Sequence, residues 1–130
     1  FLEASNMFRR LSTRLLSRRF STEIPINKTC RQIRYKVTGE ADAVKVWALM
    51  EEGKEEVKKI PGVEKIAQKI CKSEWNGETT IVFKDLDSLV SYMENEQPKM
   101  VAAPFFEKFM EIVVPGSVST QNFVYEEEEF

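Results

Sequence analysis

The stretch that decides the fold is Trp75-Asn76-Gly77-Glu78-Thr79-Thr80-Ile81-Val82-Phe83. Its second half, Thr79–Phe83, is rich in β-branched residues and predicts a strand. Asn76-Gly77 predicts a turn before it, because this pair tolerates positive φ at low cost. The periodicity of the preceding Glu64–Ser73 fits either a helix or a strand. Since a hairpin needs a strand on each side of its turn, we expect a strand there.

Two more elements precede this hairpin. Gln32–Thr38 alternates strictly between apolar and polar residues, which predicts a half-buried strand. Its apolar side consists of Ile33, Tyr35 and Val37. Ala41–Ile60 then changes to helical spacing, and Pro61-Gly62 ends the predicted helix. The apolar face of this helix consists of Ala43, Val46, Trp47, Met50, Val57 and Ile60.

A helix is also predicted after the hairpin. Leu86–Glu94 has helical spacing, and either Asp85 or Asp87 can cap its start. Its apolar face consists of Leu86, Leu89, Val90 and Met93. We expect Pro98 to break this pattern, because proline lacks the N–H that a helix interior requires.

The last two predicted elements complete the fold class. Met100–Val113 is helical and aromatic-rich, with Pro104 at its start or at a kink, and Ser119–Tyr125 is a strand. The order strand–helix–strand–strand–helix–strand predicts an α+β fold. This is the ferredoxin-like β-α-β-β-α-β sandwich, an antiparallel sheet with helices on one face. The other sheet face then needs a partner or a ligand to cover it.

The start of the sequence resembles a targeting segment. Met7–Thr22 carries five arginines, no acidic residue and apolar residues at helical spacing, which is typical of a mitochondrial transit peptide. Arg18-Arg19-Phe20-Ser21 resembles a matrix-protease site with cleavage before Ser21. We therefore expect the mitochondrial matrix as the location. The alternative is a surface helix or basic arm, and the sequence leaves open whether translation starts before Phe1 or at Met7.

This division gives the expected domain layout. Residues 1–20 are the transit peptide with upstream residues, 21–30 an extended lead-in, 31–126 one domain and 127–130 an acidic tail, which we expect to be solvated. Without residues 1–20, five of the 19 basic and one of the 21 acidic residues are lost, which leaves 14 and 20 and a net charge of −6. A nucleic-acid partner is therefore not expected. The sequence contains no run of about 18 apolar residues, so we expect no transmembrane segment.

The sequence contains no histidine. Ser-His-Asp and Cys-His catalysis are therefore excluded, and so are histidine-ligated haem, zinc and non-haem iron sites built from this chain alone. The two cysteines, Cys30 and Cys71, have no metal-type spacing, and we expect free thiols. We expect neither a metal nor a cofactor.

Residues 31–126 resemble the antibiotic-biosynthesis-monooxygenase-type (ABM) domains of the dimeric α+β barrel superfamily. The motifs that carry the resemblance are Pro61-Gly62-Val63 before the second strand, Ile81–Leu89, Glu94–Met100 before an aromatic-rich helix, and a closing strand with Phe123 and Tyr125. The resemblance implies a homodimer through the open sheet face, and a cavity between sheet and helices for a small hydrophobic or aromatic substrate. Some members oxygenate aromatics without metal or cofactor. Others degrade haem, for which this chain lacks the histidine.

Cofactor-free oxygenation needs a dry pocket with donors that stabilise a carbanion. The candidate pocket residues are Arg34, Tyr35, Trp47, Trp75, Phe83 and Asn122. Each polar or aromatic candidate also has a purely structural interpretation. Arg34 and Asn122 suit solvent or the dimer interface, Tyr35 and Trp47 suit the core, and Trp75 suits an exposed turn.

Two functions from different classes follow. The first is a mitochondrial cofactor-free monooxygenase acting on a small aromatic or hydrophobic substrate. The alternative is a non-catalytic ligand-binding or accessory subunit of a larger mitochondrial complex. A ring-sized void lined by Arg34, Tyr35 or Asn122 would favour the first function. A sheet–helix space filled by Trp47 and by Phe105, Phe106 and Phe109 would contradict it.

Overall fold

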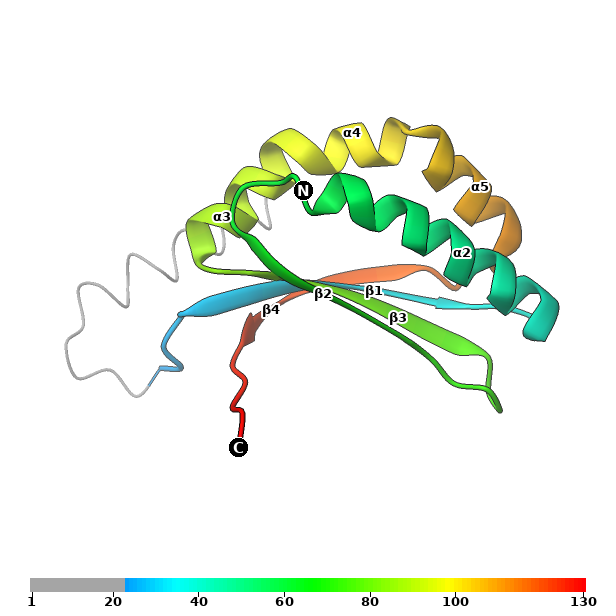
Figure 1. Cartoon of the computed structure of the whole chain (residues 1–130), viewed down its shortest axis with the longest axis horizontal. Helices are drawn as coiled ribbons and strands as arrows, with labels where there is room; N and C mark the ends of the chain where they lie inside the picture. The colour runs from blue at the N-terminus through cyan, green and yellow to red at the C-terminus, as the bar shows by residue number, and fades with distance from the viewer. Residues whose placement is uncertain (1–22) are drawn as a thin grey trace.

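The computed structural model describes residues 23–130, so the predicted transit peptide lies outside the described residues (Figure 1). One antiparallel sheet, in the order β2-β3-β1-β4, carries all described helices on the same face. The elements are β1 Lys28–Lys36, α2 Glu40–Val57, β2 Val63–Ile70, β3 Asn76–Phe83, α3 Leu86–Ser91, η1 Tyr92–Glu96, α4 Gln97–Ala102, α5 Pro104–Ile112 and β4 Ser119–Tyr125. The predicted α+β ferredoxin-like fold is confirmed.

The alternation in β1 assigns the two faces of the sheet. Tyr35 is buried toward the helices, whereas Arg34 points to the open face, where it lies opposite Glu78 of β3 and Ser119 of β4. β1 begins four residues before the predicted strand, at Lys28. Sequence reasoning missed this extension because the inward positions there are polar. One of them is Thr29, whose hydroxyl donates to the Asp85 carbonyl oxygen at 2.9 Å.

The β2–β3 hairpin is confirmed, but the predicted turn is wrong. Asn76 and Gly77 lie inside β3, and the loop before them closes with the Trp75 N–H donating to the Cys71 carbonyl oxygen at 2.9 Å. Trp75 itself takes the positive φ, at 59°. Gly77 serves a different purpose, because a Cβ there would lie 2.3 Å from the ring of Tyr35. The glycine is required by a close approach between two strands rather than by a turn.

Helix α2 buries a stripe of apolar residues, as predicted, but Trp47 is not part of it. Trp47 is 39% exposed, and Leu49 is buried in its place. The cause is the position of α5, which packs along the side of α2 that carries Leu49 and Gly53, with Phe105 close to Gly53. Trp47 lies on the opposite edge of the stripe and stays in contact with solvent. The prediction that Trp47 packs in the core is wrong.

The second helical segment runs through Pro98 without a break. Asp85 caps α3, where its Oδ1 accepts from the Ser88 N–H at 2.8 Å. The chain then continues through the π-helical η1 into α4, whose first turn contains Pro98. Proline is common in the first turn of an α-helix, and its fixed φ is compatible with helical backbone. The break comes at Ala103, which is extended because Pro104 follows it, and α5 starts at Pro104.

The core between sheet and helices consists of two clusters. The first surrounds Tyr35 and contains Val37, Ala43, Val46, Leu49, Met50, Phe109 and Val113. The second surrounds Phe83 and contains Val57, Ile60, Ile81, Leu89, Tyr92 and Met93. The rings of Tyr35 and Phe109 meet edge to face at 5.3 Å, which attaches α5 to the sheet.

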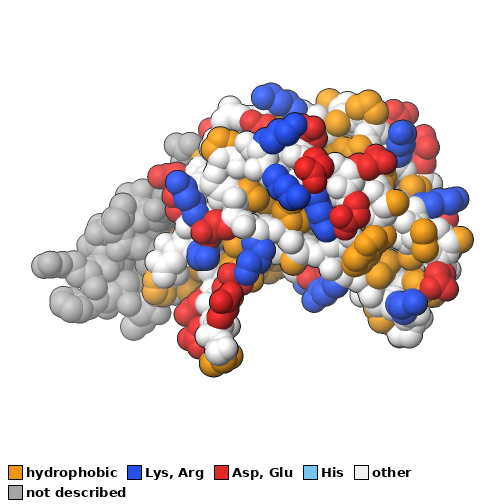
Figure 2. All heavy atoms as spheres, in the orientation of Figure 1, with side chains coloured by type: hydrophobic (Ala, Val, Ile, Leu, Met, Phe, Trp, Pro, Cys, Tyr) orange, Lys and Arg blue, Asp and Glu red, His pale blue; other side chains and the backbone are white. Residues whose placement is uncertain are grey.

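Charged side chains of both signs are spread over the outside of the helix layer, and acidic ones gather along the C-terminal tail (Figure 2). This tail is not purely solvated as predicted. Glu127 accepts from Lys65 Nζ at 2.7 Å and from the Tyr125 hydroxyl at 3.0 Å. The start of the tail is therefore held against the end of the sheet.

The surroundings of Gly77 and Gly53 predict that alanine changes the free energy of unfolding in opposite directions at the two positions. Gly77→Ala should lower the free energy of unfolding by about 1 to 3 kcal/mol, because a buried ring must move. Gly53→Ala in α2 is the matched control. A Cβ there would lie at an ordinary 3.5 Å from Phe105, and helix propensity should raise the free energy of unfolding by about 1 kcal/mol. Urea unfolding followed by circular dichroism measures both, and a Gly77→Ala protein as stable as wild type would contradict this contact.

Candidate ligand-binding site

The six residues predicted to line a pocket do not form one site, although two of them, Arg34 and Tyr35, both line a hollow at the open sheet face. Arg34 lies on the open sheet face, Trp47 on the outside of α2, and half-buried Trp75 in the hairpin loop. Phe83 is fully buried, with its ring 5.3 Å from that of Tyr92. Tyr35 is buried as well, and its burial raises the pKa of the phenol. These positions give no single site.

Asn122 lies on the helix face of β4, not on the dimer or solvent side as predicted. Its Oδ1 accepts from Nη1 of Arg31, 2.9 Å away, and Arg31 is only 4% exposed. Burial lowers the pKa of this guanidinium. The β1–β4 register sets this arrangement, because it places Asn122 directly opposite Arg31 on the inward side. The amide of Asn122 therefore belongs to a structural contact between two strands.

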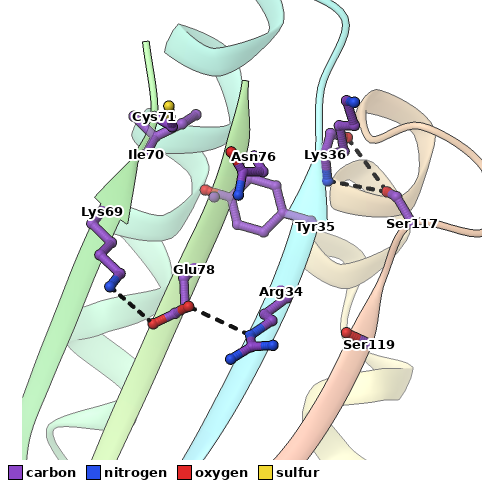
Figure 3. A pocket seen from close by; sticks show the side chains of 11 residues that line it. Arg34, Tyr35, Lys36, Lys69, Ile70, Cys71, Asn76, Glu78, Ser117 and Ser119 are labelled. Carbon is purple, nitrogen blue, oxygen red and sulfur yellow. Dashed lines mark hydrogen bonds and ion pairs between the residues drawn. The ribbon is translucent and has the colours of Figure 1, made fainter. Parts of the chain in front are cut away.

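A wide hollow lies at one end of the open sheet face, with a volume of about 700 Å³ (Figure 3). Glu78 lies at its centre and pairs with Arg34 Nε at 3.5 Å and with Lys69 Nζ at 3.4 Å. The same carboxylate accepts from the Gln32 amide at 2.6 Å. These charges therefore satisfy one another, and the hollow opens widely to solvent.

Both cysteines are free thiols, as expected. Cys71 lies at the rim of the open-face hollow, and contacts with the Ser73 hydroxyl and the Glu74 N–H lower the pKa of its thiol. Burial raises the pKa of the Cys30 thiol. Within residues 23–130, no group of cysteine and acidic side chains is arranged to hold a metal ion.

A second, smaller hollow lies between the sheet and the helices, and we call it the slot. Its volume is about 50 Å³. The lining side chains that form its walls are Met50, Val57, Ile81, Met100, Phe105 and Phe109. Met50 and Phe109 belong to the first core cluster, while Val57 and Ile81 belong to the second. The slot is therefore the place where the two clusters meet without filling the space.

Three polar residues also line the slot. The ammonium of Lys54 is engaged by Glu51 at 2.6 Å. The other two, Gln68 and Thr79, lie opposite each other on β2 and β3. Both amide atoms of Gln68 and the hydroxyl of Thr79 are buried and have no hydrogen-bond partner within the described part of the chain. Buried polar groups normally have partners, so this pair calls for an explanation.

The slot matches neither outcome foreseen from the sequence. Arg34, Tyr35 and Asn122 do not line it, and Trp47 does not fill it. The three phenylalanines of α5 occupy part of the space, and what remains is smaller than the ~150 Å³ cavity that holds a benzene ring. Sequence reasoning missed Gln68 and Thr79. The available signal was an amide between Ile66 and Ile70 on the inward side of β2.

Structural comparison finds the same fold in proteins of low sequence identity. The cofactor-independent oxygenase SnoaB from Streptomyces nogalater aligns with a TM-score of 0.59 and 13% identity, over 78% of this chain and 96% of that one. The monooxygenase from the gene ActVA-Orf6 of Streptomyces coelicolor, determined with nanaomycin D, aligns with a TM-score of 0.62 and 11% identity, over 81% and 92%. A dimeric ferredoxin-like protein from an uncultured marine organism aligns with a TM-score of 0.60 and 15% identity, over 79% and 99%.

No protein-family model and no curated sequence matches the chain. The common ground with these proteins is thus the arrangement of strands and helices. None of the helices between residues 23 and 130 combines the length and apolarity needed to cross a membrane. The chain has the α+β ferredoxin-like fold of the antibiotic-biosynthesis-monooxygenase-type domains.

Proposed function

We propose that this protein is a monooxygenase-like domain that binds a small aromatic or hydrophobic molecule in the slot and oxygenates it without a cofactor. The observation that carries the proposal is the slot itself, an apolar space left between sheet and helices in an otherwise packed core. The structural likeness to two oxygenases, one described as cofactor-independent and one determined with nanaomycin D, supports this reaction class.

Ligand entry requires the slot to widen. Phe105 and Phe106 are half-buried and form its outer wall. Both stand at the start of α5, directly after the extended residue Ala103 that separates α5 from α4. A change at Ala103 moves these two rings while Phe109 keeps α5 attached to Tyr35. In this proposal the ligand therefore enters the slot at the start of α5.

The reaction is an oxygenation of an activated methylene by O₂. The methylene carbon loses two hydrogens and gains one oxygen atom as a carbonyl, and the second oxygen atom leaves as water. The described lining contains no carboxylate, and its one amine is held by Glu51. The substrate must therefore be acidic enough to ionise by itself, as anthrones are. The protein then contributes orientation and exclusion of water.

Oxygen consumption with anthrone tests this proposal. The wild-type chain should consume one O₂ per anthrone, and Gly53→Leu should reduce the rate at least tenfold, because its side chain points into the slot. Ala48→Leu is the matched control, since Ala48 lies on the exposed side of the same helix, and its rate should equal that of wild type. An oxygen electrode measures the rates. Equal rates in all three proteins would contradict a reaction in the slot.

The second candidate is a non-catalytic ligand-binding or accessory subunit of a larger mitochondrial complex. It is favoured by one observation, the lack of a carboxylate or a free amine in the lining of the slot. Binding of an aromatic probe without oxygen consumption would select this candidate. Native sizing after a pull-down from mitochondria would then show whether the chain belongs to a larger assembly.

We further propose a homodimer closed through the open sheet face. No described helix covers this face, and a hollow of about 420 Å³ runs along it. The hollow combines apolar Val82 and Phe123 with polar Gln32 and Thr80, a mixture suited to a protein interface. The likeness to a dimeric ferredoxin-like protein supports this state.

A single charge on the open face should dissociate the dimer. Ala67 is exposed there, so Ala67→Arg leaves the protomer intact but places two arginines in the interface. Light scattering at micromolar concentration should give a dimer for wild type and a monomer for Ala67→Arg. Ala48→Arg on α2 is the control and should remain dimeric. A monomeric wild-type chain would contradict the homodimer and assign the open face to a different protein.

We also propose that the protein resides in the mitochondrial matrix, on the basis of the arginine-rich, acid-free segment Met7–Thr22. Deletion of residues 7–20 should abolish import into isolated mitochondria. The control is a chain in which the arginines of this segment are replaced by lysines. It keeps the positive charge that the membrane potential attracts and should still be imported. Unchanged import of the deleted chain would refute the proposal.

A further inference from the structure

We propose that Gln68 and Thr79 are the specificity-determining residues of the slot, and that they bind an uncharged oxygen-bearing group, a hydroxyl or a carbonyl, at one edge of the ligand. This inference rests on the proposed binding of a ligand in the slot. It adds which residues recognise the ligand and what chemical group they select.

The register of the sheet brings the two side chains together. Gln68 of β2 is paired directly with Thr79 of β3, so both side chains leave the sheet on the same, inward side. Directly opposed residues in antiparallel strands have Cβ atoms about 5 Å apart. The two side chains are thus neighbours, yet neither donates to the other. Together they form a polar patch on the sheet-side wall of the slot.

The lack of hydrogen-bond partners in this patch lowers the stability of the folded state. Thr79 is only 7% exposed, and its hydroxyl and both amide atoms of Gln68 are shielded from solvent. A buried polar group without a partner destabilises the folded state, whereas valine at position 79 would have the same shape and no such cost. The helix side of the slot offers methionine, valine and phenylalanine side chains, together with Lys54, whose ammonium is paired with Glu51 at 2.6 Å. The missing partner must therefore enter the slot from outside.

The chemistry of the patch limits the partner. The amide of Gln68 offers two donors and an acceptor, and the hydroxyl of Thr79 offers a donor and an acceptor. A hydroxyl or carbonyl oxygen of the ligand can form hydrogen bonds with both side chains at the same time. A buried carboxylate or ammonium needs a free opposite charge, and the one charged group in the lining, Lys54, is already paired with Glu51. The ligand group is therefore polar and uncharged.

Two probes of equal shape test the inference on the full chain. 1-Naphthol and 1-methylnaphthalene differ by a hydroxyl in place of a methyl group, and their own fluorescence reports binding. Wild type should prefer the naphthol. Thr79→Val and Gln68→Met should each weaken naphthol binding by roughly three- to tenfold and leave methylnaphthalene binding unchanged or stronger. Thr79→Ser keeps the hydroxyl and should retain the preference.

Two further measurements separate recognition from a structural role. The melting temperature of the free Thr79→Val chain should be equal to or higher than that of wild type, since the substitution removes an unpaired hydroxyl. The side-chain amide resonances of Gln68 should shift with naphthol and not with methylnaphthalene. A Thr79→Val chain that loses both probes equally would overturn the inference.

The remaining outcomes distinguish this inference from the proposed function. If wild type binds both probes with equal affinity, the slot binds ligands but Gln68 and Thr79 do not select them, and a trapped water is their partner. This result overturns the inference alone. If wild type binds neither probe, both the inference and ligand binding in the slot fail.

Discussion

The contact of Tyr35 with Gly77 on one side and Phe109 on the other holds the sheet and the helix layer together. Gly77 leaves room for the ring between two central strands, since a Cβ there would lie 2.3 Å from it. The opposite edge of the ring meets Phe109 at 5.3 Å and fixes α5. Because α5 also carries Phe105 and Phe106, this one aromatic contact determines where the outer wall of the slot stands. A larger residue at position 77 would displace that wall as well as the strand.

Helices on one face alone give the sheet two chemically different sides. The inward side is apolar apart from a few placed polar groups, whereas the open side carries charges that pair across the strands around Glu78. The ion pairs are partly exposed, and such pairs add little stability. They do, however, place paired charges on a face that no described helix covers. The fold thereby leaves one face for the proposed assembly and the other for the proposed ligand.

Sequence patterns predicted the elements better than their contacts. Alternation in β1 assigned inward and outward residues correctly because a half-buried strand must alternate, whereas Asn122 of β4 was expected on the wrong side. Local chemistry left two candidates for the cap of α3, Asp85 and Asp87, and the structure selects Asp85. The errors arose where a distant segment decides. Asn76-Gly77 fits a turn locally, but Tyr35 requires Gly77 inside a strand. Trp47 fits the apolar stripe of its helix, but α5 packs along the other edge.

The candidate site was hidden from the sequence for the same reason. Gln68 and Thr79 are separated by a hairpin loop, and only the register of β2 and β3 makes them neighbours. Neither residue belongs to a motif, and each alone is an ordinary strand residue. What sets the pair apart is that their polar atoms without hydrogen-bond partners among the described residues lie side by side in the lining of one slot, which exists only once the helices have closed over the sheet. The slot of about 50 Å³ where the two core clusters meet thus carries three unpaired polar atoms on one wall. At these two positions a hydrocarbon side chain of the same shape would cost less than a polar one, and this is the physical argument for a ligand that supplies the missing partner.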